Sequence, residues 1–513
     1  MSARRWLPPA LAGIAAVALG LGAAELAAAL VAPTASPIFV VGSLLIDFAP
    51  PWAKDAAIAL FGTGDKAALL TGIGIALLAI SAAAGVLQWR RPPIGRLLIV
   101  AGAILGIGAA ITRSGATVLD AVPSTVAAVV GVASLGFLLR RIPELPVPDA
   151  ATTTSTDPAH ALRRDGDPTR RSFLGWAGGA TAIGVLAAVG GTLLEAGARA
   201  ATAVRDAFKL PKPAVAAPPV AAGAELGIPG LAPIVTPNAL FYRIDTALQI
   251  PRIDPTTWTL RITGEIENEV ELTWNELIAL PLEESHTTLT CVSNEVGGDL
   301  IGNALWLGYP VRELLARAAP KAGADMVLSR SIDGFTAGTP LTVLQDDRNA
   351  ILAIGMNGEP LPEEHGFPAR LVVPGLYGYV SATKWVVELE VTRFSRASAY
   401  WTDRGWGVRG PIKVESRIDV ARAGTIAGVA WCQHTGISRV EVQVDDDGWV
   451  DADLAAAISI DTWRQWKYDW DATKGQHTIR VRATTADGET QTSDVAGVLP
   501  DGATGYHTVD VTI

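Results

Sequence analysis

Residues 289–306 read LTCVSNEVGGDLIGNALW, and Cys291 near the start of this stretch is the most informative residue of the chain. The chain has only two cysteines, Cys291 and Cys432, which gives no disulfide framework. A lone cysteine between a threonine and a turn rich in Ser, Asn and Gly has two interpretations. It is either an inert buried thiol or a thiolate that binds a soft metal. The residue type alone leaves both open.

Charge and hydropathy divide the chain of 513 residues into two unlike parts. Residues 1–212 carry 18 Lys and Arg against 12 Asp and Glu, whereas residues 213–513 carry 23 against 39. Hydrophobic residues make up 49% of the chain, so we expect the basic part to lie in a membrane. The acidic part is long enough to fold around its own core. Its charge argues against a nucleic-acid partner, because phosphates need a basic face.

Five apolar segments predict membrane-spanning helices within a membrane domain of residues 1–206. They cover residues 11–31, 67–89, 94–111, 122–139 and 172–194. A shorter apolar stretch, 37–52, predicts an interfacial or re-entrant piece. Glu25 is the one ionisable residue deep in a span. It either hydrogen bonds to another helix or takes part in proton or quinone chemistry.

The distribution of positive charge predicts the orientation of this domain in the cell membrane. With a cytoplasmic N-terminus, the inner loops hold eleven arginines and the outer loops only three cations. Five spans then place the rest of the chain outside the cytoplasm. The string Arg170-Arg171-Ser172-Phe173-Leu174, followed by an apolar run, is similar to a twin-arginine export signal. Ordinary arginines at a membrane border are the alternative.

The exported part divides into a linker and two domains. Residues 207–235 are rich in Pro and Ala and predict an extended, stiff linker. Residues 236–408 mix short strands with short helices and predict an α+β domain. Its predicted elements are strands at 257–264, 369–373 and 385–391, and helices at 273–279 and 310–319. Residues 409–513 hold short alternating runs between turns, and they predict an immunoglobulin-like sandwich.

Four separated motifs resemble, in the same order, motifs of the sulfite oxidase superfamily. They are TPNALFYR at 236–243, the Cys291 loop, HGFPARLVVPG at 365–375 and GYVSATKW at 378–385. The resemblance covers both exported domains. It implies a molybdopterin-binding domain at 236–408 and a dimerisation domain at 409–513, and hence a candidate homodimer.

The resemblance also implies roles for individual residues. Cys291 would be the thiolate ligand of a molybdenum atom carried by molybdopterin. The expected contacts to the pterin and its phosphate are Asn238, Tyr242, Arg243, His365, Arg370, Ser381 and Lys384. The reaction expected of such a site is the transfer of an oxygen atom between water and a small substrate. Soft thiolate ligands and cationic side chains around a phosphate suit this cofactor.

The chain departs from sulfite oxidases where those enzymes bind their anionic substrate. They carry an arginine shortly after the ligand cysteine, whereas this chain has Asn294-Glu295-Val296. Arg404 and His434 are the candidate catalytic substitutes near the domain junction. Fewer cations weaken the case for a dianion such as sulfite. A sulfoxide reductase-like enzyme fed by membrane electrons is therefore an alternative, as is a cofactor-free, membrane-tethered binding protein.

No haem is expected in this chain. All six histidines lie outside the predicted spans, and no Cys-x-x-Cys-His sequence occurs. Electrons would therefore pass to or from a separate partner, either a cytochrome or a quinone-linked membrane protein.

Overall fold

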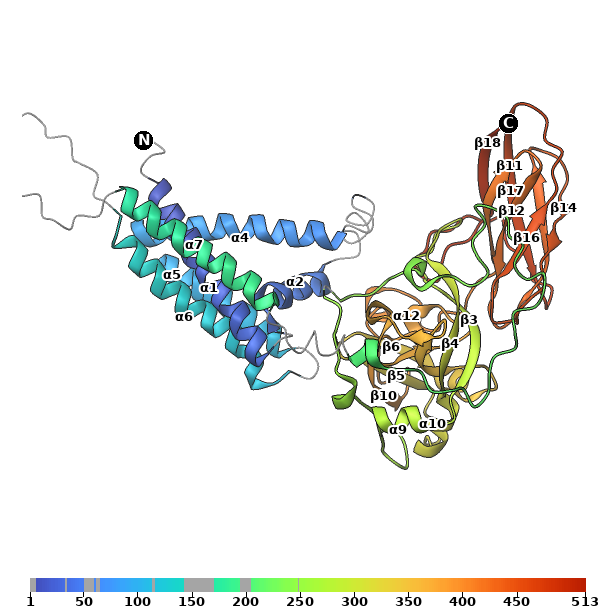
Figure 1. Ribbon diagram of the computed structural model, residues 1–513, viewed down its shortest axis with the longest axis horizontal. Helices are drawn as coiled ribbons and strands as arrows, with labels where there is room; N and C mark the ends of the chain where they lie inside the picture. Colours follow the sequence, from blue (N-terminus) through green and yellow to red (C-terminus); the bar gives the residue numbers. More distant parts are fainter. Residues whose placement is uncertain are drawn as a thin grey trace, which may run out of the picture. The chain divides into compact units, whose positions relative to one another are not determined.

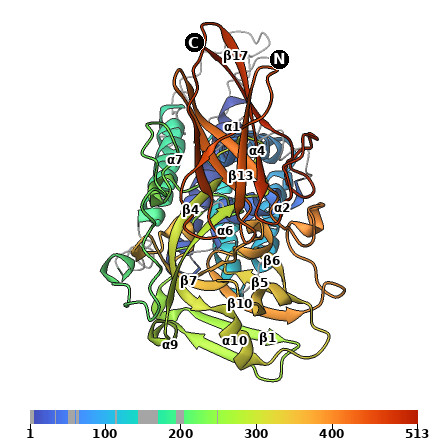
Figure 2. The ribbon, with the colours of Figure 1, turned by 90° about the vertical axis from the view of Figure 1, so that its right-hand side faces the viewer.

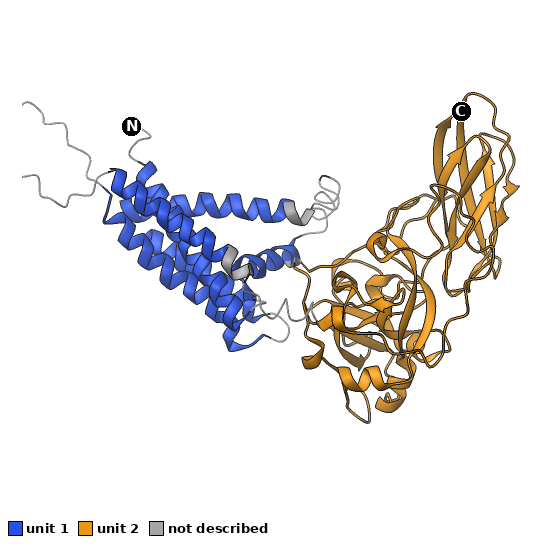
Figure 3. Ribbon diagram, viewed as in Figure 1, with its two compact units in different colours: residues 1–196 blue, residues 197–513 orange. Residues whose placement is uncertain are grey.

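The computed structural model describes residues 6–32, 35–49, 60, 65–112, 116–142, 170–193, 204–247 and 249–513. The chain divides into two compact units, residues 1–196 and 197–513 (Figure 3). The first unit is helical and the second is rich in strands, which agrees with a membrane part followed by a sheet-rich part.

The helices of unit 1 are arranged around α1. They are α1 (Leu7–Val31), α2 (Pro37–Phe48), α4 (Asp65–Arg90), α5 (Ile94–Ile111), the 3-10 helix η4 (Val118–Ala121), α6 (Val122–Leu139) and α7 (Arg170–Leu193). α1 packs against α4, α6 and α7, while α5 packs against α4 and α6 (Figure 1).

Four helices of the described chain are long and apolar enough to cross a membrane. They are Leu7–Val31, Ala68–Arg90, Ile94–Ile111 and Val118–Leu139. These helices coincide with the first four predicted spans and support a membrane protein. The predicted fifth span falls on α7 up to Leu193, and its crossing of the membrane stays a prediction. The stretch 37–52 forms the short helix α2, and its residues 50–52 lie outside the described part of the chain.

α1 and α4 approach each other closely at two glycines. A Cβ atom added to Gly13 would lie 2.0 Å from the carbonyl oxygen of Ser81, and one on Gly85 would lie 1.9 Å from that of Pro9. No side chain fits at these separations, so the two backbones are in contact. Small residues at the crossing are what allow membrane helices to pack this tightly.

Glu25 of α1 has a defined polar partner. Its Oε1 accepts a hydrogen bond of 2.6 Å from Oγ of Ser36, the residue before α2. Such a bond satisfies part of the carboxyl group in an otherwise apolar helix. The interpretation in which Glu25 bonds another segment therefore has a structural basis, while a proton or quinone role is untested.

The first domain of unit 2 is built on two sheets of five strands each. One has the order β2-β1-β10-β5-β6, with β1 and β10 parallel and the other pairs antiparallel. Its strands are β1 (Thr259–Gly264), β2 (Val270–Thr273), β5 (Met326–Ser331), β6 (Thr336–Pro340) and β10 (Val386–Thr392). Figure 2 shows β1, β10 and β5 side by side.

The other sheet has the order β3-β4-β7-β8, and β9 pairs with β7. Its strands are β3 (Glu283–Thr290), β4 (Ile301–Pro310), β7 (Ile351–Met356), β8 (Glu359–Pro360) and β9 (Arg370–Val372). All of its pairs are antiparallel. β3 and β4 matter most for function, because the Cys291 loop joins them.

Short helices connect these strands, and the predicted ones are present. They are α9 (Trp274–Ala279), α10 (Val311–Ala318), α11 (Leu341–Gln345), α12 (Gly378–Ser381) and the 3-10 helices η6 (Asn238–Leu240), η7 (Pro255–Thr257), η8 (Glu363–His365) and η9 (Thr402–Arg404). α9 begins with a capping box, in which Glu276 Oε2 accepts from the Thr273 amide at 2.8 Å. The predicted strands near 257–264, 369–373 and 385–391 appear as β1, β9 and β10.

The second domain of unit 2 consists of two antiparallel sheets of four strands, ordered β11-β12-β16-β15 and β14-β13-β17-β18. The strands are β11 (Glu415–Arg422), β12 (Thr425–Trp431), β13 (Ile437–Val444), β14 (Val450–Asp451), β15 (Asp453–Leu454), β16 (Arg464–Tyr468), β17 (Gln476–Thr485) and β18 (His507–Thr512). Ile426, Trp466, Val440 and Val481 from both sheets share one buried cluster. We call this domain the sandwich; its immunoglobulin-like character stays a prediction.

Residues 207–235, predicted as a linker, are extended from residue 208 onward and packed against both domains. Leu231 lies in a buried cluster with Val420 and Ala427 of the sandwich. The carbonyl oxygen of Ile234 accepts hydrogen bonds from Nε1 of Trp463 at 2.9 Å and from Nδ2 of Asn303 at 2.7 Å. This segment therefore ties β4 of the first domain to the sandwich and is no free spacer.

Candidate active site

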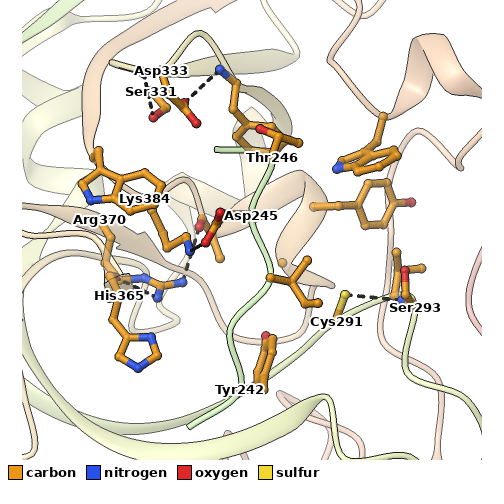
Figure 4. A pocket seen from close by; sticks show the side chains of 18 of the residues that line it. Tyr242, Asp245, Thr246, Cys291, Ser293, Ser331, Asp333, His365, Arg370 and Lys384 are labelled. Carbon is orange, nitrogen blue, oxygen red and sulfur yellow. Dashed lines mark hydrogen bonds and ion pairs between the residues drawn. The ribbon is translucent and has the colours of Figure 1, made fainter. Parts of the chain in front are cut away.

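A pocket in the first domain of unit 2 brings together five of the residues predicted to bind a cofactor. The five are Tyr242, Cys291, His365, Arg370 and Lys384. They come from all four motifs, which are far apart in the sequence. The pocket contains about 860 Å³ of space, part of which is open to solvent. Figure 4 shows His365, Arg370 and Lys384 on one side and Cys291 with Ser293 on the other.

Cys291 is the first residue of the loop between β3 and β4. Its amide donates a hydrogen bond of 2.9 Å to the carbonyl oxygen of Leu300, which holds the two ends of the loop together. Its Sγ accepts a hydrogen bond of 3.4 Å from the amide of Ser293. Burial raises the pKa of the Cys291 thiol. A bound metal cation would therefore be needed to hold the sulfur as a thiolate.

Arg370 places a buried guanidinium group in the same pocket. Its Nη1 donates to the carbonyl oxygen of His365 at 3.1 Å and its Nη2 to that of Ala382 at 3.3 Å. Among the described residues, no carboxylate pairs with it. Burial lowers the pKa of Arg370 to about 10, so the group stays charged near neutral pH. A buried cation held only by neutral oxygens favours an anionic ligand such as a phosphate.

His365 is a neutral neighbour of this cation. Its Nε2 lies 3.2 Å from the carbonyl oxygen of Asn238, and its ring meets the ring of Phe241 edge to face. Burial, reinforced by Arg370, lowers the pKa of His365 to about 4. The imidazole is therefore uncharged at neutral pH and can contact a ligand through a ring nitrogen without adding charge.

Lys384 is the second buried cation, and its partner Asp245 was missed in the sequence. Lys384 Nζ lies 2.8 Å from Oδ2 of Asp245 and 3.0 Å from the carbonyl oxygen of Glu364. Burial lowers the pKa of Lys384 to about 8 despite the attraction of Asp245. Asp245 follows the first motif by two residues, but an acidic residue there gives no indication that it will pair with a lysine from the fourth motif.

Five other predicted residues are not found among the described residues that line the pocket. Arg243 pairs with Asp245 at 2.8 Å. Asn238 accepts a hydrogen bond from Asn357 through Oδ1, and its backbone oxygen contacts His365. Both residues thus hold residues that do line the pocket.

Ser381, Arg404 and His434 are engaged elsewhere. Ser381 Oγ donates to the carbonyl oxygen of Tyr377, four residues earlier, at 2.9 Å. Arg404 Nη1 donates to the carbonyl oxygen of Tyr400 at 2.7 Å, and its guanidinium stacks on the Tyr400 ring. His434 Nδ1 lies 3.1 Å from Oδ1 of Asp461. Neither Arg404 nor His434 is among the described residues that line the pocket, and their role as substitutes for the missing cations stays a prediction.

The sandwich supports the Cys291 loop, which the sequence did not predict. Gln433 Nε2 donates to the carbonyl oxygen of Thr288 at 3.2 Å and to Oγ1 of Thr290 at 2.9 Å, at the end of β3. Arg417 Nη1 donates to the carbonyl oxygen of Gly298 in the loop at 2.8 Å. These contacts fix both sides of the loop from residues more than a hundred positions away in the sequence.

Comparison with known proteins agrees with this site. The family described as "Oxidoreductase molybdopterin binding domain" matches residues 247–401. The uncharacterized oxidoreductase YuiH of Bacillus subtilis is 32% identical over 160 residues, which cover 31% of this chain and 76% of that protein. Mitochondrial sulfite oxidase of Mus musculus is 27% identical over 288 residues, 45% of this chain and 52% of that protein. This chain thus spans about half the length of that sulfite oxidase.

The chain belongs to the family of oxidoreductases with a molybdopterin-binding domain, within the sulfite oxidase superfamily. Nitrate reductase [NADH] 1 of Oryza sativa is a further relative, 32% identical over 31% of this chain and 20% of its own length. Among solved structures, the sulfane dehydrogenase SoxCD of Paracoccus pantotrophus matches with a TM-score of 0.48 and 22% identity over 54% of this chain and 81% of that one.

The residues of the pocket fit the cofactor that this family implies. Arg370 and Lys384 are buried cations, and Arg370 has no carboxylate partner among the described residues. A phosphate-bearing pterin would supply the missing negative charge. Cys291 offers a buried sulfur on the same pocket, and sulfur is a preferred ligand of soft metals.

Proposed function

We propose that this protein is a membrane-anchored, molybdopterin-dependent oxidoreductase that transfers an oxygen atom between water and a small substrate, as sulfite oxidases do. One observation carries the proposal: the buried thiol of Cys291 shares a pocket with the buried cations Arg370 and Lys384. A site of this kind can hold a metal at one side and a phosphate at the other.

Each pocket residue then has a role in holding the cofactor. Cys291 is the metal ligand, and Arg370 and Lys384 bind the negative charge of the pterin phosphate. Tyr242 and His365 are uncharged contacts, because burial raises the pKa of Tyr242 above its ordinary value and lowers that of His365. When bound, the molybdenum centre supplies two-electron chemistry, while the protein orients it and shields it from water.

The membrane unit keeps the enzyme at the cell membrane. We place unit 2 on the extracytoplasmic side, because positive charge gathers in the loops predicted to be cytoplasmic. Export by the twin-arginine route would let the domain cross after folding around its cofactor. Electrons then pass to or from a separate cytochrome or quinone-linked partner. Self-association through the sandwich belongs to the same proposal.

A sulfoxide reductase-like activity is the second candidate. The observation that favours it is the loop after Cys291, which carries Asn294, Glu295 and Val296 where sulfite oxidases place an arginine. A third candidate, a cofactor-free membrane-tethered binding protein, predicts that the purified protein contains no metal.

The molybdenum content of the purified full-length protein tests the proposal. We expect about one molybdenum per chain in the wild type, because a single soft sulfur ligand lines the pocket. Cys291→Ser should abolish oxygen-atom transfer and leave the unfolding temperature unchanged. Cys432→Ser is the matched control, because Cys432 is equally buried but lies outside the pocket. A folded, active wild type without molybdenum would refute the proposal.

A further inference from the structure

The charges that line the pocket leave no surplus cation for an anionic substrate. Its charged lining residues are the cations Arg370 and Lys384 and the carboxylates Asp245 and Asp333. His365 is neutral, because burial lowers its pKa to about 4. The lining residues therefore sum to no net charge before the cofactor binds. Arg243, outside the lining, also pairs with Asp245 at 2.8 Å and adds one positive charge. The phosphate of the proposed cofactor would take up this charge and leave no surplus cation in the occupied pocket.

The two cations also lie away from the sulfur. Figure 4 shows Arg370 and Lys384 together on one side, beside Asp245, and Cys291 on the other side. Lys384 is paired with Asp245 at 2.8 Å. Both cations are thus engaged on their own side of the pocket, Lys384 by a carboxylate and Arg370 by backbone oxygens.

Three aromatic side chains that line the pocket, Tyr379, Trp401 and Trp406, form what we call the aromatic wall. The ring centres of Tyr379 and Trp406 are 5.9 Å apart, and those of Trp401 and Trp406 are 6.1 Å apart. Rings in contact at these distances present a continuous apolar surface. Such a surface binds flat or bulky apolar groups and disfavours a bare anion.

The aromatic wall is held in place by hydrogen bonds from both domains. Tyr379 donates its hydroxyl to the carbonyl oxygen of Gly407 at 2.7 Å, so the phenol supports the segment that carries Trp406. The amide of Gly407 donates to the carbonyl oxygen of Pro500, in the sandwich, at 2.9 Å. The amide of Trp406 donates to the carbonyl oxygen of Trp401 at 3.2 Å. A wall fixed in this way is preorganised for its ligand.

We infer that the substrate is an uncharged organic molecule that carries an aromatic or bulky apolar group, and that the aromatic wall selects it. This inference rests on the proposed function, because it assumes that the reacting atom meets a metal at Cys291. The wall binds the apolar group, and the absence of a surplus cation among the described lining residues rejects anions of the same size.

Binding of inert ligands of matched shape tests the inference without any redox step. Methyl phenyl sulfone and benzenesulfonate have nearly the same size and differ in charge, whereas dimethyl sulfone is neutral but lacks the ring. Titration calorimetry on the molybdenum-loaded, full-length protein measures each affinity. We expect methyl phenyl sulfone to bind about ten-fold more tightly than either of the others, a difference of about 1.4 kcal/mol. Equal or tighter binding of benzenesulfonate would overturn the inference.

Substitutions of pocket residues test which side chains determine the selectivity between the ligands. Trp406→Ala should reduce the affinity for methyl phenyl sulfone about ten-fold, and Trp406→Phe should restore most of it, because a phenyl ring keeps an apolar face. Trp449→Ala is the matched control, since Trp449 packs on Tyr506 within the sandwich. Asp333→Asn keeps the oxygen that accepts from the Phe335 amide but removes a charge, so it should strengthen benzenesulfonate binding selectively. Unchanged affinities in both Trp406→Ala and Asp333→Asn would overturn the inference.

The molybdenum content of the same samples separates the two possible failures. If the metal is present and the sulfone and the sulfonate bind equally, the inference about the substrate fails and the proposed function stands. If the folded protein takes up no molybdenum, the proposed function fails, and the inference that rests on it fails with it.

Discussion

Replacing Lys384 by Met tests whether the pocket is built to bind negative charge. In the cofactor-free protein, burial lowers the pKa of Lys384 from its ordinary 10.5 to about 8. The folded state therefore holds this proton less tightly than the unfolded state does. Below pH 8 the lysine is charged in both states, and its burial reduces the free energy of unfolding. Between pH 8 and 10.5 the unfolded chain binds more protons, so stability is regained as the pH rises.

The size of this effect follows from the two pKa values. At about 1.4 kcal/mol per pH unit, the difference between 10.5 and 8 corresponds to about 3 kcal/mol. Lys384→Met lacks the titrating group, so the difference in unfolding free energy between wild type and variant should change by about 3 kcal/mol from pH 7 to pH 11. Losses that do not depend on pH, such as the bond to Glu364, cancel in this comparison.

Chemical unfolding of the cofactor-free, full-length protein, followed by tryptophan fluorescence, measures this difference. Eleven of the fifteen tryptophans lie in unit 2, so the fluorescence reports mainly on the unfolding of unit 2, which contains Lys384. Lys467→Met is the control, because Lys467 is partly exposed and pairs with Asp469 in the sandwich. Lys384→Met should also retain less molybdenum cofactor than wild type. If the free energies of unfolding of wild type and Lys384→Met changed with pH by the same amount, the argument that burial destabilises the Lys384 ammonium would be refuted.

Two further changes test the Cys291 loop and the export route. Gly297→Ala should destabilise unit 2 by about 1–3 kcal/mol in chemical unfolding. The added Cβ would lie 2.2 Å from the His507 ring, and Gly297 has a positive φ of 81°. Gly448→Ala is the control and should leave the stability unchanged, because the space around Gly448 is open. Equal stability of the two variants would show that the loop tolerates displacement. Replacing Arg170 and Arg171 by Lys keeps both charges but removes the guanidinium groups, and unit 2 should then stay cytoplasmic. A protease added outside intact cells that still cleaves unit 2 would contradict the twin-arginine prediction.

The pocket residues that stand in short sequence motifs could be predicted from the sequence. Tyr242, Cys291, His365, Arg370 and Lys384 each stand in a short, specific string, and the fold brings all five to one pocket. The four apolar helices and the capping box of α9 were predictable for the same reason, since their determinants are close together in the sequence.

The remaining features depend on distant contacts or on competing local bonds. Asp245 pairs with a lysine 139 residues away, and Gln433 reaches β3 from 143 and 145 residues away. A pattern within a short stretch of sequence contains no information about pairs that are so far apart. Ser381 shows the opposite case, because its hydroxyl donates to the carbonyl oxygen of Tyr377, the residue before α12, as serines in helices commonly do.

Because residues of the sandwich support the Cys291 loop, the site can form only after the sandwich has been translated. Arg417 and Gln433 hold the loop and the end of β3, and the ring of His507 lies against Gly297. During translation, at about 5–20 residues per second, these residues leave the ribosome tens of seconds after the helices of unit 1. The pocket around Cys291 is therefore still incomplete when the helices of unit 1 have emerged. Under the proposed function, loading of the cofactor would therefore be a late, post-translational event, and a chain released before His507 would hold no cofactor.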